Sequence, residues 1–456
     1  MVEVVIFIPG IMGSELFLGE KEDANRLRIW PGAISELFLP YQNMEKLLDP
    51  NLTVGDIIRR ISVSTQYDSL VDALITCGFT ENAEAPTLRV CPYDWRKDNA
   101  LAADVLAGHI TFMRKAHGPE VVINIVAHSM GGLISRYFLE SGKFSEKTHP
   151  GFANIRRLIT IGTPHRGAPI ALHAALGQMK RLFLSAKQVK RLANDPQFPA
   201  LYQLLPPPAE PFLWDSNLAS RLSPVNLYMS HISKKLGLSS ANLDKATAFH
   251  AALNIANQPA GVDYFCFVGT RQKTVSNIRY DFNNYEYTPP PIVETEDGGD
   301  GTVPSWSASV SGMQQLLVGG DHGSLYKPKE VLRDLAFLLG KGGVLAGSAD
   351  DAIRISVHDE VVLPLQQVSL ILFISDRTSL DADIVVHKLI DQDGEILENP
   401  AKIYGFAVKY SGPAASSISL KFIAPRYPGA YEIDILINHK SASECKFILF
   451  VQSPLL

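Results

Sequence analysis

The sequence predicts an α/β protein with a mostly parallel sheet, followed by a smaller all-β region. Buried-strand patterns alternate with amphipathic helix patterns from the N-terminus to about residue 340, which is typical of sheets covered by helices on both faces. Residues 341–350 are rich in Gly, Ala and Ser and are predicted to form a linker. Beyond the linker, apolar residues alternate with period two, which favours antiparallel strands.

Length and composition agree with a two-domain globular protein. The chain has 456 residues, too many for one ordinary core, so we expect two domains or one large domain with insertions. Apolar residues make up 46% and charged residues 20% of the chain, as in proteins with an ample core. A formal net charge of −5 gives no sign of nucleic-acid binding.

Location and cysteine chemistry are also suggested by the sequence. Val4 to Ile8 already has the pattern of a buried strand, so a secretory signal is not evident and a cytoplasmic location is favoured. No apolar run approaches the roughly 20 residues that span a bilayer. The four cysteines show no CxxC spacing and are interpreted as buried free thiols rather than disulfides or metal ligands; they are Cys77, Cys91, Cys266 and Cys445.

The first 340 residues contain six strand patterns and four helix patterns. The strands are short apolar runs, whereas the helices repeat apolar residues every three or four positions. The predicted strands are Val4–Ile8, Leu88–Val90, Val121–Val126, Arg157–Gly162, Tyr264–Gly269 and Gln315–Val318. The predicted helices are Tyr67–Cys77, Leu101–Ala116, Gly132–Glu140 and Lys329–Leu339.

Two long stretches interrupt this alternation. Residues 168–260 contain helical segments, and residues 14–65 are expected to be irregular. Because long loops inside a domain are more often functional than accidental, both are interpreted as cap or lid insertions. The first stretch carries apolar side chains that look exposed, namely Phe17, Trp30, Leu37, Phe38, Leu39 and Tyr41.

The region 351–456 is predicted to be an immunoglobulin-like β-sandwich. Turn residues such as Asp393-Gly394 and Pro428-Gly429 separate its strands. The predicted strands are Ile353–Val357, Val368–Ser375, Ile384–Leu389, Ile403–Tyr410, Ile418–Ala424, Tyr431–Asn438 and Lys446–Val451.

Ser129 is the candidate nucleophile. An apolar strand run ends just before it, small residues surround it (Ala127, Gly131 and Gly132), and a helical pattern follows. This is the strand, sharp turn and helix that a nucleophile elbow requires, in which the serine hydroxyl is exposed above the sheet. The pattern indicates a hydrolase or an acyltransferase.

His322 is the candidate base. It follows the last predicted core strand, lies between glycines, and precedes the terminal helix. Open α/β sheets build their sites at this end of the strands.

Asp300 is the candidate acid, on a glycine-rich turn between the nucleophile and the base. Its carboxylate would hold the imidazole in the required tautomer, and the order Ser, Asp, His is that of α/β-hydrolases. Asp297 and Asp321 are competing acids. The structural alternative for this Asp-Gly turn is a calcium site or simple turn chemistry.

Two backbone amides are candidates for an oxyanion hole. Met130 directly follows the nucleophile, and Ile11 lies in the Pro9–Ser14 turn after the first strand, with Met12 as its alternative. Such donors typically contribute about 10²–10³ in turnover. The structural alternative is an ordinary turn after the first strand.

Together these strings resemble lecithin:cholesterol acyltransferase-type α/β-hydrolases over residues 1 to about 340. The string Pro92-Tyr93-Asp94-Trp95-Arg96 is the most family-specific of them. The others are Pro9-Gly10-Ile11-Met12-Gly13-Ser14, Ala127-His128-Ser129-Met130-Gly131-Gly132, Ile161-Gly162-Thr163-Pro164-His165-Arg166-Gly167 and Gly299-Asp300-Gly301-Thr302-Val303-Pro304.

The resemblance implies an α/β-hydrolase fold and a lipid acyl-ester substrate. It also implies attack by Ser129, a triad completed by Asp300 and His322, and an acyl-enzyme resolved by water or by an acceptor alcohol, with no metal or organic cofactor. The usual first glycine of the elbow is Ala127 here, and the disulfides of secreted members are not evident.

Trp30, Phe38, Leu39 and the 168–260 insertion are expected to contact acyl chains or a membrane surface; the alternative is that they are insertion core. Met12 is a further candidate substrate-binding residue. Asp94 and Arg96 are expected to form an ion pair that supports the site loops. The expected partners are a lipid ester, a membrane surface contacted peripherally, and a protein bound through the β-sandwich. The alternative functions are a soluble carboxylesterase or thioesterase, and a non-catalytic binding protein with a vestigial triad.

Overall fold

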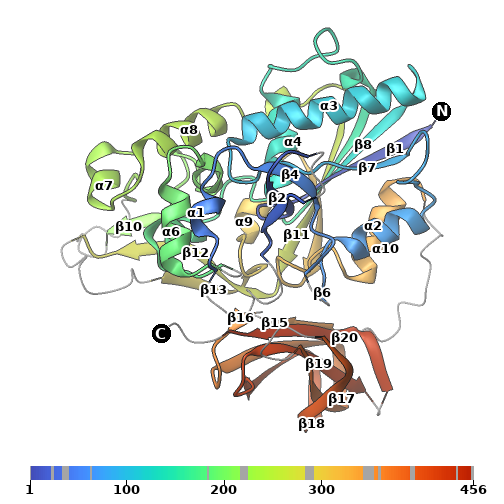
Figure 1. The fold of residues 1–456 in the computed structure, drawn as a ribbon, viewed down its shortest axis with the longest axis vertical. Helices are drawn as coiled ribbons and strands as arrows, with labels where there is room; N and C mark the ends of the chain where they lie inside the picture. The colour runs from blue at the N-terminus through green and yellow to red at the C-terminus, as the bar shows by residue number, and fades with distance from the viewer. Residues whose placement is uncertain are drawn as a thin grey trace.

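A computed structural model shows a parallel six-stranded sheet at the centre of the N-terminal region (Figure 1). It describes all residues except 1, 22–24, 33–40, 62–63, 182–183, 216–223, 283–291, 342–353, 358–360, 391–395, 438–439 and 453–456. The strand order is β14-β11-β9-β8-β1-β7. The strands are β1 (Glu3–Ile8), β7 (Leu88–Val90), β8 (Val122–His128), β9 (Ile155–Ile161), β11 (Asp263–Thr270) and β14 (Gln314–Gly319).

This sheet confirms the predicted α/β class and all six predicted core strands. Every neighbouring pair in it is parallel. The chain goes from β1 to β7 on one side and then returns to β8 on the other. Parallel sheets bind ligands where the strand order reverses in this way, so the carboxyl ends of β1 and β8 are the expected place for a site.

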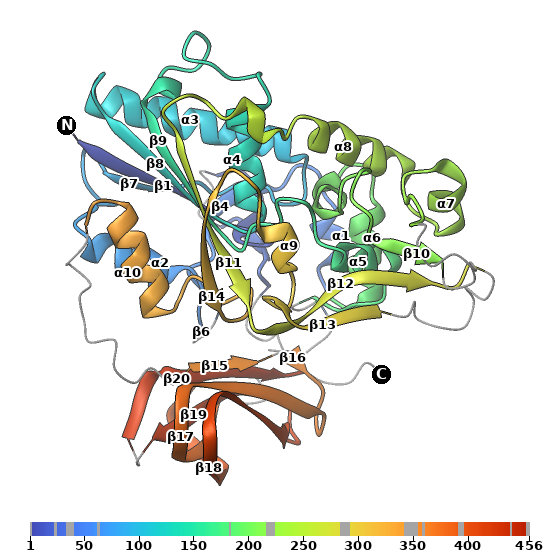
Figure 2. The ribbon, with the colours of Figure 1, turned by 180° about the vertical axis from the view of Figure 1, so that it is seen from behind.

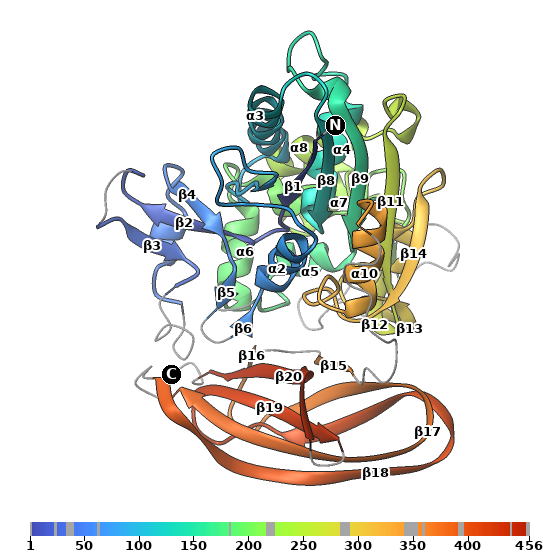
Figure 3. The ribbon, with the colours of Figure 1, turned by 90° about the vertical axis from the view of Figure 1, so that its right-hand side faces the viewer.

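Helices cover both faces of the sheet. Alternate residues of β1 enter two different cores: Val4, Ile6 and Ile8 face one, while Val5 and Phe7 face the other. Helices α3 (Asn99–His117) and α4 (Met130–Glu140) contribute to the first core, and α2 (Asp68–Thr76) and α10 (Lys329–Leu338) to the second. Figure 3 shows α2 and α10 side by side. All four helices match the sequence prediction.

The 14–65 stretch is more ordered than expected. It contains an antiparallel sheet in the order β3-β2-β4, a small β5–β6 ladder and a short helix. The irregular assignment is therefore wrong, because backbone pairing organises the segment. The elements are β2 (Ser14–Leu18), β3 (Leu27–Trp30), α1 (Met44–Leu47), β4 (Thr53–Ile57), β5 (Arg60–Ile61) and β6 (Ser64–Thr65).

The apolar residues of this stretch also differ from expectation. Trp30 and Tyr41 are buried rather than exposed, because they pack against each other and join the main core. Leu37, Phe38 and Leu39 lie outside the described residues.

The 168–260 insertion is largely helical, as predicted, and has its own core. Strands β12 and β13 extend from the end of β11 toward these helices (Figure 2), and β10, β12 and β13 form a three-stranded sheet. The elements of the insertion are α5 (Ile170–Leu176), α6 (Ala186–Asn194), η3 (Pro199–Leu204), β10 (Leu213–Asp215), α7 (Ser230–Lys235), α8 (Ser240–Ala251) and η4 (Ile255–Asn257). The two strands that follow it are β12 (Gln272–Tyr280) and β13 (Ile292–Gly299). Shorter elements elsewhere are η2 (Phe152–Asn154) and α9 (Ser305–Ala308).

The C-terminal region is all-β, as predicted, but four of its predicted strands merge into two. Strands β17 and β18 are each continuous, because shifts in their register around Phe373, Arg377 and Ser379 bend the pair without ending it. Side chains from both halves of β17, such as Leu372 and Ile384, then share one core. The strands are β15 (Arg354–Val357), β16 (Val361–Val362), β17 (Gln367–Ile390), β18 (Ile396–Ile423), β19 (Gly429–Ile437) and β20 (Lys440–Val451).

Some expectations reach beyond the described residues. The predicted linker is undescribed from residue 342 onward, so the domain limits and the immunoglobulin-like assignment stay predictions. Cys77, Cys91 and Cys266 are buried free thiols, as predicted, whereas the side chain of Cys445 is not described. In the described part of the chain, no helix combines the length and apolar character needed to cross a membrane.

Candidate active site

Ser129 lies in a strained turn between β8 and α4. Its φ of 53° and ψ of −124° fall outside the conformations that most residues adopt, which costs about 1–3 kcal/mol. Hydrogen bonds on both sides hold it there. The Ser129 amide donates to the carbonyl of Ile161 at 2.9 Å, and the Thr163 hydroxyl donates to the Ser129 carbonyl at 2.9 Å.

Close packing around the turn explains the small residues of the motif. A Cβ atom on Gly131 would lie 2.6 Å from the carbonyl oxygen of Ile8, and one on Gly10 would lie 2.9 Å from the Ser129 Cβ. Both separations are too short for a side chain. The glycines therefore allow α4 to begin directly against the carboxyl end of β1, as an elbow requires.

The structure brings Ser129, His322 and Asp300 together in one hydrogen-bonded chain. His322 Nε2 lies 2.8 Å from Ser129 Oγ, and His322 Nδ1 lies 2.8 Å from Asp300 Oδ2. An ionised carboxylate only accepts hydrogen bonds, so Nδ1 carries the proton and Nε2 accepts the serine hydroxyl. The three residues are only 4%, 7% and 1% exposed, respectively.

A hairpin returns Asp300 to the end of β11. Strand β12 leaves just after β11, and β13 comes back so that Gly299 pairs with Gln272 at its base. Asp300 Oδ1 then accepts the amides of Thr302 at 3.0 Å and Val303 at 2.7 Å. These bonds occupy one carboxylate oxygen and leave the other for the histidine.

The competing acids have other positions. Asp321 Oδ1 accepts the amide of Ser324 at 3.2 Å, and Oδ2 bonds the Ser324 hydroxyl, so this side chain closes its own turn. The side chain of Asp297 lies outside the described residues. Of the three candidates, Asp300 is the one that the structure shows bonded to His322.

A second buried chain, which the sequence did not predict, links the Pro9–Ser14 turn to His322. The Gly10 amide donates to the Tyr67 hydroxyl at 3.0 Å, and that hydroxyl lies 2.8 Å from His128 Nδ1. His128 Nε2 lies 3.0 Å from the carbonyl oxygen of His322. Because a carbonyl only accepts, Nε2 carries the proton and the Tyr67 hydroxyl donates to Nδ1.

Burial, reinforced by the neighbouring His322 ring, lowers the pKa of His128 well below its usual value. Burial likewise raises the pKa of Tyr67. Both groups are therefore neutral at physiological pH. The only sequence signal for this chain is the place of His128 beside Ser129, since Tyr67 is distant in sequence.

The Pro92–Arg96 string holds the same turn from its other side. The Tyr93 hydroxyl donates to the carbonyl of Pro9 at 2.9 Å, and the Tyr93 amide donates to the Ser14 hydroxyl at 3.1 Å. The Trp95 indole donates to the carbonyl of Ser14 at 3.2 Å. This turn carries the Ile11 amide, while the Met130 amide begins α4, where helical N–H groups have no intrahelical partner.

The Asp94–Arg96 ion pair forms as predicted. Arg96 Nε and Nη2 lie 2.8 and 2.7 Å from the two Asp94 carboxylate oxygens. Arg96 is 2% exposed, and its Nη1 also donates to the carbonyls of Leu47 and Asp49. The pair thus ties the motif to the 14–65 insertion.

Of the three predicted substrate-binding residues, two are buried and one lies outside the described residues. Trp30 is fully buried, stacks edge-on against Trp95 at 5.2 Å, and donates to the carbonyl of Met12 at 3.0 Å. Its expected exposure to substrate is therefore not found, because the indole packs against Trp95 and Tyr41 in the core. Met12 is also buried and has a positive φ of 63°. Phe38 lies outside the described residues.

Comparisons with known proteins confirm the resemblance seen in the sequence. Residues 56–235 match the family described as lecithin:cholesterol acyltransferase. The matched segment contains Ser129 and the Pro92–Arg96 string but ends before Asp300 and His322.

Three proteins illustrate the similarity. Lecithin-cholesterol acyltransferase-like 4 of Arabidopsis thaliana is 27% identical, over 79% of this chain and 78% of its own. Phospholipase A(1) LCAT3 of the same plant is 22% identical, over 74% of this chain and 90% of its own. The lysosomal phospholipase A and acyltransferase of Homo sapiens is 26% identical, over 53% of this chain and 56% of its own.

Proposed function

We propose that this protein is a serine-dependent acyl-ester hydrolase or acyltransferase that acts on phospholipid-type esters. The observation that carries the proposal is the chain of two 2.8 Å hydrogen bonds that joins Ser129, His322 and Asp300. The lipid substrate is supported by the relatives, whose names describe phospholipases and acyltransferases.

In the first half of the proposed mechanism, His322 removes the Ser129 proton while Oγ attacks the ester carbonyl. Asp300 stabilises the imidazolium that forms. The carbonyl oxygen becomes an oxyanion, which the amides of Ile11 and Met130 stabilise. The tetrahedral intermediate then collapses, and His322 returns the proton to the departing alcohol, leaving the acyl group on Ser129.

In the second half, His322 takes a proton from the acceptor, which attacks the acyl-enzyme through its oxygen. Water gives a free fatty acid and an alcohol gives a new ester, and in each case Ser129 is regenerated with its proton. The triad geometry is the same for both outcomes, so the acceptor decides between hydrolysis and transfer.

The test of the nucleophile is covalent labelling. A fluorophosphonate should modify the intact protein at Ser129, located by mass spectrometry of its peptides. Ser129→Ala should remove the adduct. Ser135→Ala is a matched control, because this serine is buried in α4 and bonds the Gly131 carbonyl. Absence of an adduct in folded protein would sink the enzyme assignment.

The test of the substrate is product analysis. Phosphatidylcholine vesicles supplied with a long-chain alcohol should yield free fatty acid, an alkyl ester, or both. A chain-length series of p-nitrophenyl esters should favour long chains and respond to added vesicles. Preference for acetate, unaffected by lipid, would contradict the lipid assignment and favour a soluble esterase.

A further inference from the structure

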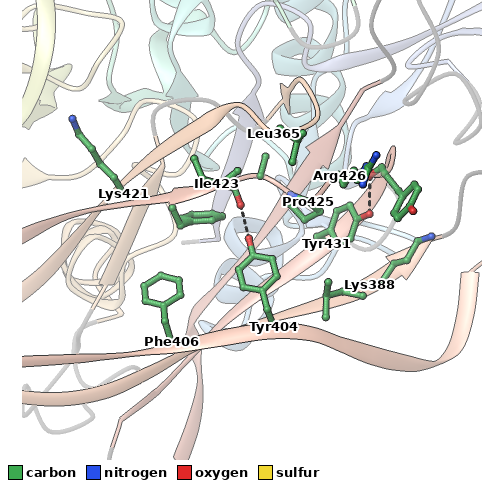
Figure 4. A pocket seen from close by; sticks show the side chains of 13 residues that line it. Leu365, Lys388, Tyr404, Phe406, Lys421, Ile423, Pro425, Arg426 and Tyr431 are labelled. Atoms are coloured by element: carbon green, nitrogen blue, oxygen red, sulfur yellow. Dashed lines mark hydrogen bonds between the residues drawn. The ribbon is translucent and has the colours of Figure 1, made fainter.

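A pocket of about 590 Å³ opens in the C-terminal β region (Figure 4). Its lining comes from β18, the end of β17, the start of β19, the connection between β18 and β19, and Leu365. The volume is within the range of small-molecule sites, which is roughly 300–1,000 Å³. The described lining includes no residue of the Ser129 site.

The walls of the pocket are mainly apolar. Tyr404, Phe406, Phe422 and Tyr431 contribute rings to the lining. The two tyrosine hydroxyls are already used within the protein. Tyr404 donates to the carbonyl of Ile423 at 2.6 Å, and Tyr431 donates to a backbone carbonyl at 2.7 Å. Their rings are thus available to line the pocket while their polar atoms are satisfied.

Three basic side chains also line the pocket: Lys388, Lys421 and Arg426. Figure 4 shows the amino groups of Lys388 and Lys421 extending from opposite ends of it. Among the described residues, none of the three has a carboxylate within 4.0 Å. By contrast, Lys446 pairs with Glu432 at 2.9 Å and Lys409 with Asp381 at 3.2 Å. Since the chain carries a net charge of −5, this is a local excess of positive charge.

The pocket also carries exposed apolar side chains. Leu365, Ile403, Ile423 and Tyr427 line it and are each between 46% and 62% exposed. Clustered apolar exposure marks interaction sites. Lysine and arginine stems cover apolar surface while their charges stay in water, and tyrosine is favoured at membrane interfaces. The same small surface therefore combines features that suit an anionic bilayer.

We propose that this pocket binds an anionic glycerophospholipid at a bilayer surface, with part of an acyl chain between the aromatic rings and anionic headgroups of the bilayer beside Lys388, Lys421 and Arg426. An acyl chain loses no hydrogen bonds on entering the apolar walls, whereas a peptide backbone there would lose its bonds to water. The occupant is therefore a lipid rather than an acidic peptide. This lipid site is separate from the chemistry at Ser129.

The first test measures binding of the full chain to vesicles by co-sedimentation, in a Ser129→Ala background so that no lipid is consumed. Binding should be tighter to vesicles that contain phosphatidylglycerol than to phosphatidylcholine alone. Each basic side chain near an anionic surface contributes about fivefold in affinity. The triple variant Lys388→Gln, Lys421→Gln, Arg426→Gln should therefore weaken binding on the order of 100-fold.

The matched control is Lys115→Gln, Lys147→Gln, Lys234→Gln, which removes the same charge from exposed positions outside the C-terminal β region. It should bind within about twofold of the parent, because surface charges act only within about 10 Å in salt. Equal weakening of vesicle binding by both triple variants would overturn the proposal. So would equal affinity of the parent protein for vesicles with and without phosphatidylglycerol. The latter result would leave a soluble partner as the occupant.

A second test localises the contact. Tyr427→Trp should show fluorescence quenched by bromine-labelled acyl chains, whereas Phe337→Trp, an exposed position on α10, should not. Inorganic phosphate should fail to compete with the vesicles. Lack of quenching at position 427 would overturn the proposal even if the protein binds vesicles elsewhere. The triple charge variant should also be made with Ser129 intact and labelled with the fluorophosphonate. Labelling at Ser129 would show that a loss of vesicle binding is separate from a failure of the proposed enzyme function.

Discussion

His128 donates a hydrogen bond from Nε2 to the backbone carbonyl of His322, at a distance of 3.0 Å. The residue next to the candidate nucleophile thus holds the main chain of the candidate base. Because His128 Nδ1 also accepts from Tyr67, which accepts from Gly10, one neutral chain spans three loops of the site. We expect this chain to fix how far His322 lies from Ser129.

Tyr67→Phe tests that expectation. The variant leaves the Gly10 amide and His128 Nδ1 without their partner, so unfolding free energy should fall by about 1–3 kcal/mol. A small displacement of His322 should lower kcat by about 10- to 100-fold, with little change in KM. Tyr137→Phe is the control, because no hydrogen bond of the Tyr137 hydroxyl is found among the described residues. A stability loss with unchanged kcat would contradict a positioning role.

Asp300→Asn should lower kcat by about 10⁴-fold, because an amide favours the wrong tautomer of His322. Steady-state kinetics on a p-nitrophenyl ester measures the effect. Asp321→Asn is matched in chemistry and lies one residue from His322, but its contacts stay within its own turn. It should retain activity within about threefold of the parent, since it alters no hydrogen bond of the base. A larger loss from Asp321→Asn than from Asp300→Asn would reassign the acid.

Stability should fall as pH drops below about 6.5, the usual histidine pKa. Burial lowers the pKa of His250 to about 4 and those of His128 and His165 well below the usual value. Their depressed folded-state pKa values mean that the unfolded chain binds protons that the folded chain does not. Lowering the pH therefore favours unfolding.

For His250 alone, the loss between pH 7.5 and pH 5 should be about 2 kcal/mol. Urea unfolding at the two pH values measures it. His250→Gln should reduce the pH dependence by that amount, whatever its effect at neutral pH. His231→Gln, at an exposed position on α7, should leave the pH dependence unchanged. An unaltered slope in the His250 variant would refute this account.

Arg96→Ala should reduce unfolding free energy by about 3–5 kcal/mol, because the buried Asp94 carboxylate then keeps only its longer contact with Lys97, at 3.7 Å. Two backbone carbonyls of the 14–65 insertion would also lose their donor. Thermal or urea unfolding measures the change. Lys143→Ala removes an exposed pair with Asp104 and should cost no more than about 1 kcal/mol. Similar losses in both variants would show that burial does not strengthen the dependence on Arg96.

The sequence predicts the central sheet well because its inner strands β1, β8, β9 and β11 are largely buried on both faces and are therefore rich in apolar residues. Ser129, Asp300 and His322 could be selected because each follows a recognisable strand or turn and their chain order fits. Tyr67 could not be connected to His128, since that contact joins residues far apart in sequence and leaves no local pattern.

Two other features of the structure, the merged strands of the C-terminal region and the burial of Trp30, could not be predicted from the sequence. The merger of strands in β17 and β18 depends on register shifts around Phe373 and Arg377, which bend the pair without a turn signal. Trp30 was expected at the surface because an aromatic residue in an apparently irregular segment has no periodicity to show which way it faces. Its packing against Trp95 depends on the tertiary fold.

The two ends of the hairpin formed by β12 and β13 have different structural roles. Its base, where Gln272 meets Gly299, sets the position of Asp300, while its outer part joins the core of the 168–260 insertion. The distance that the chain travels between these two residues does not alter where it returns. Outer parts of the hairpin could therefore be exchanged without moving the candidate acid Asp300.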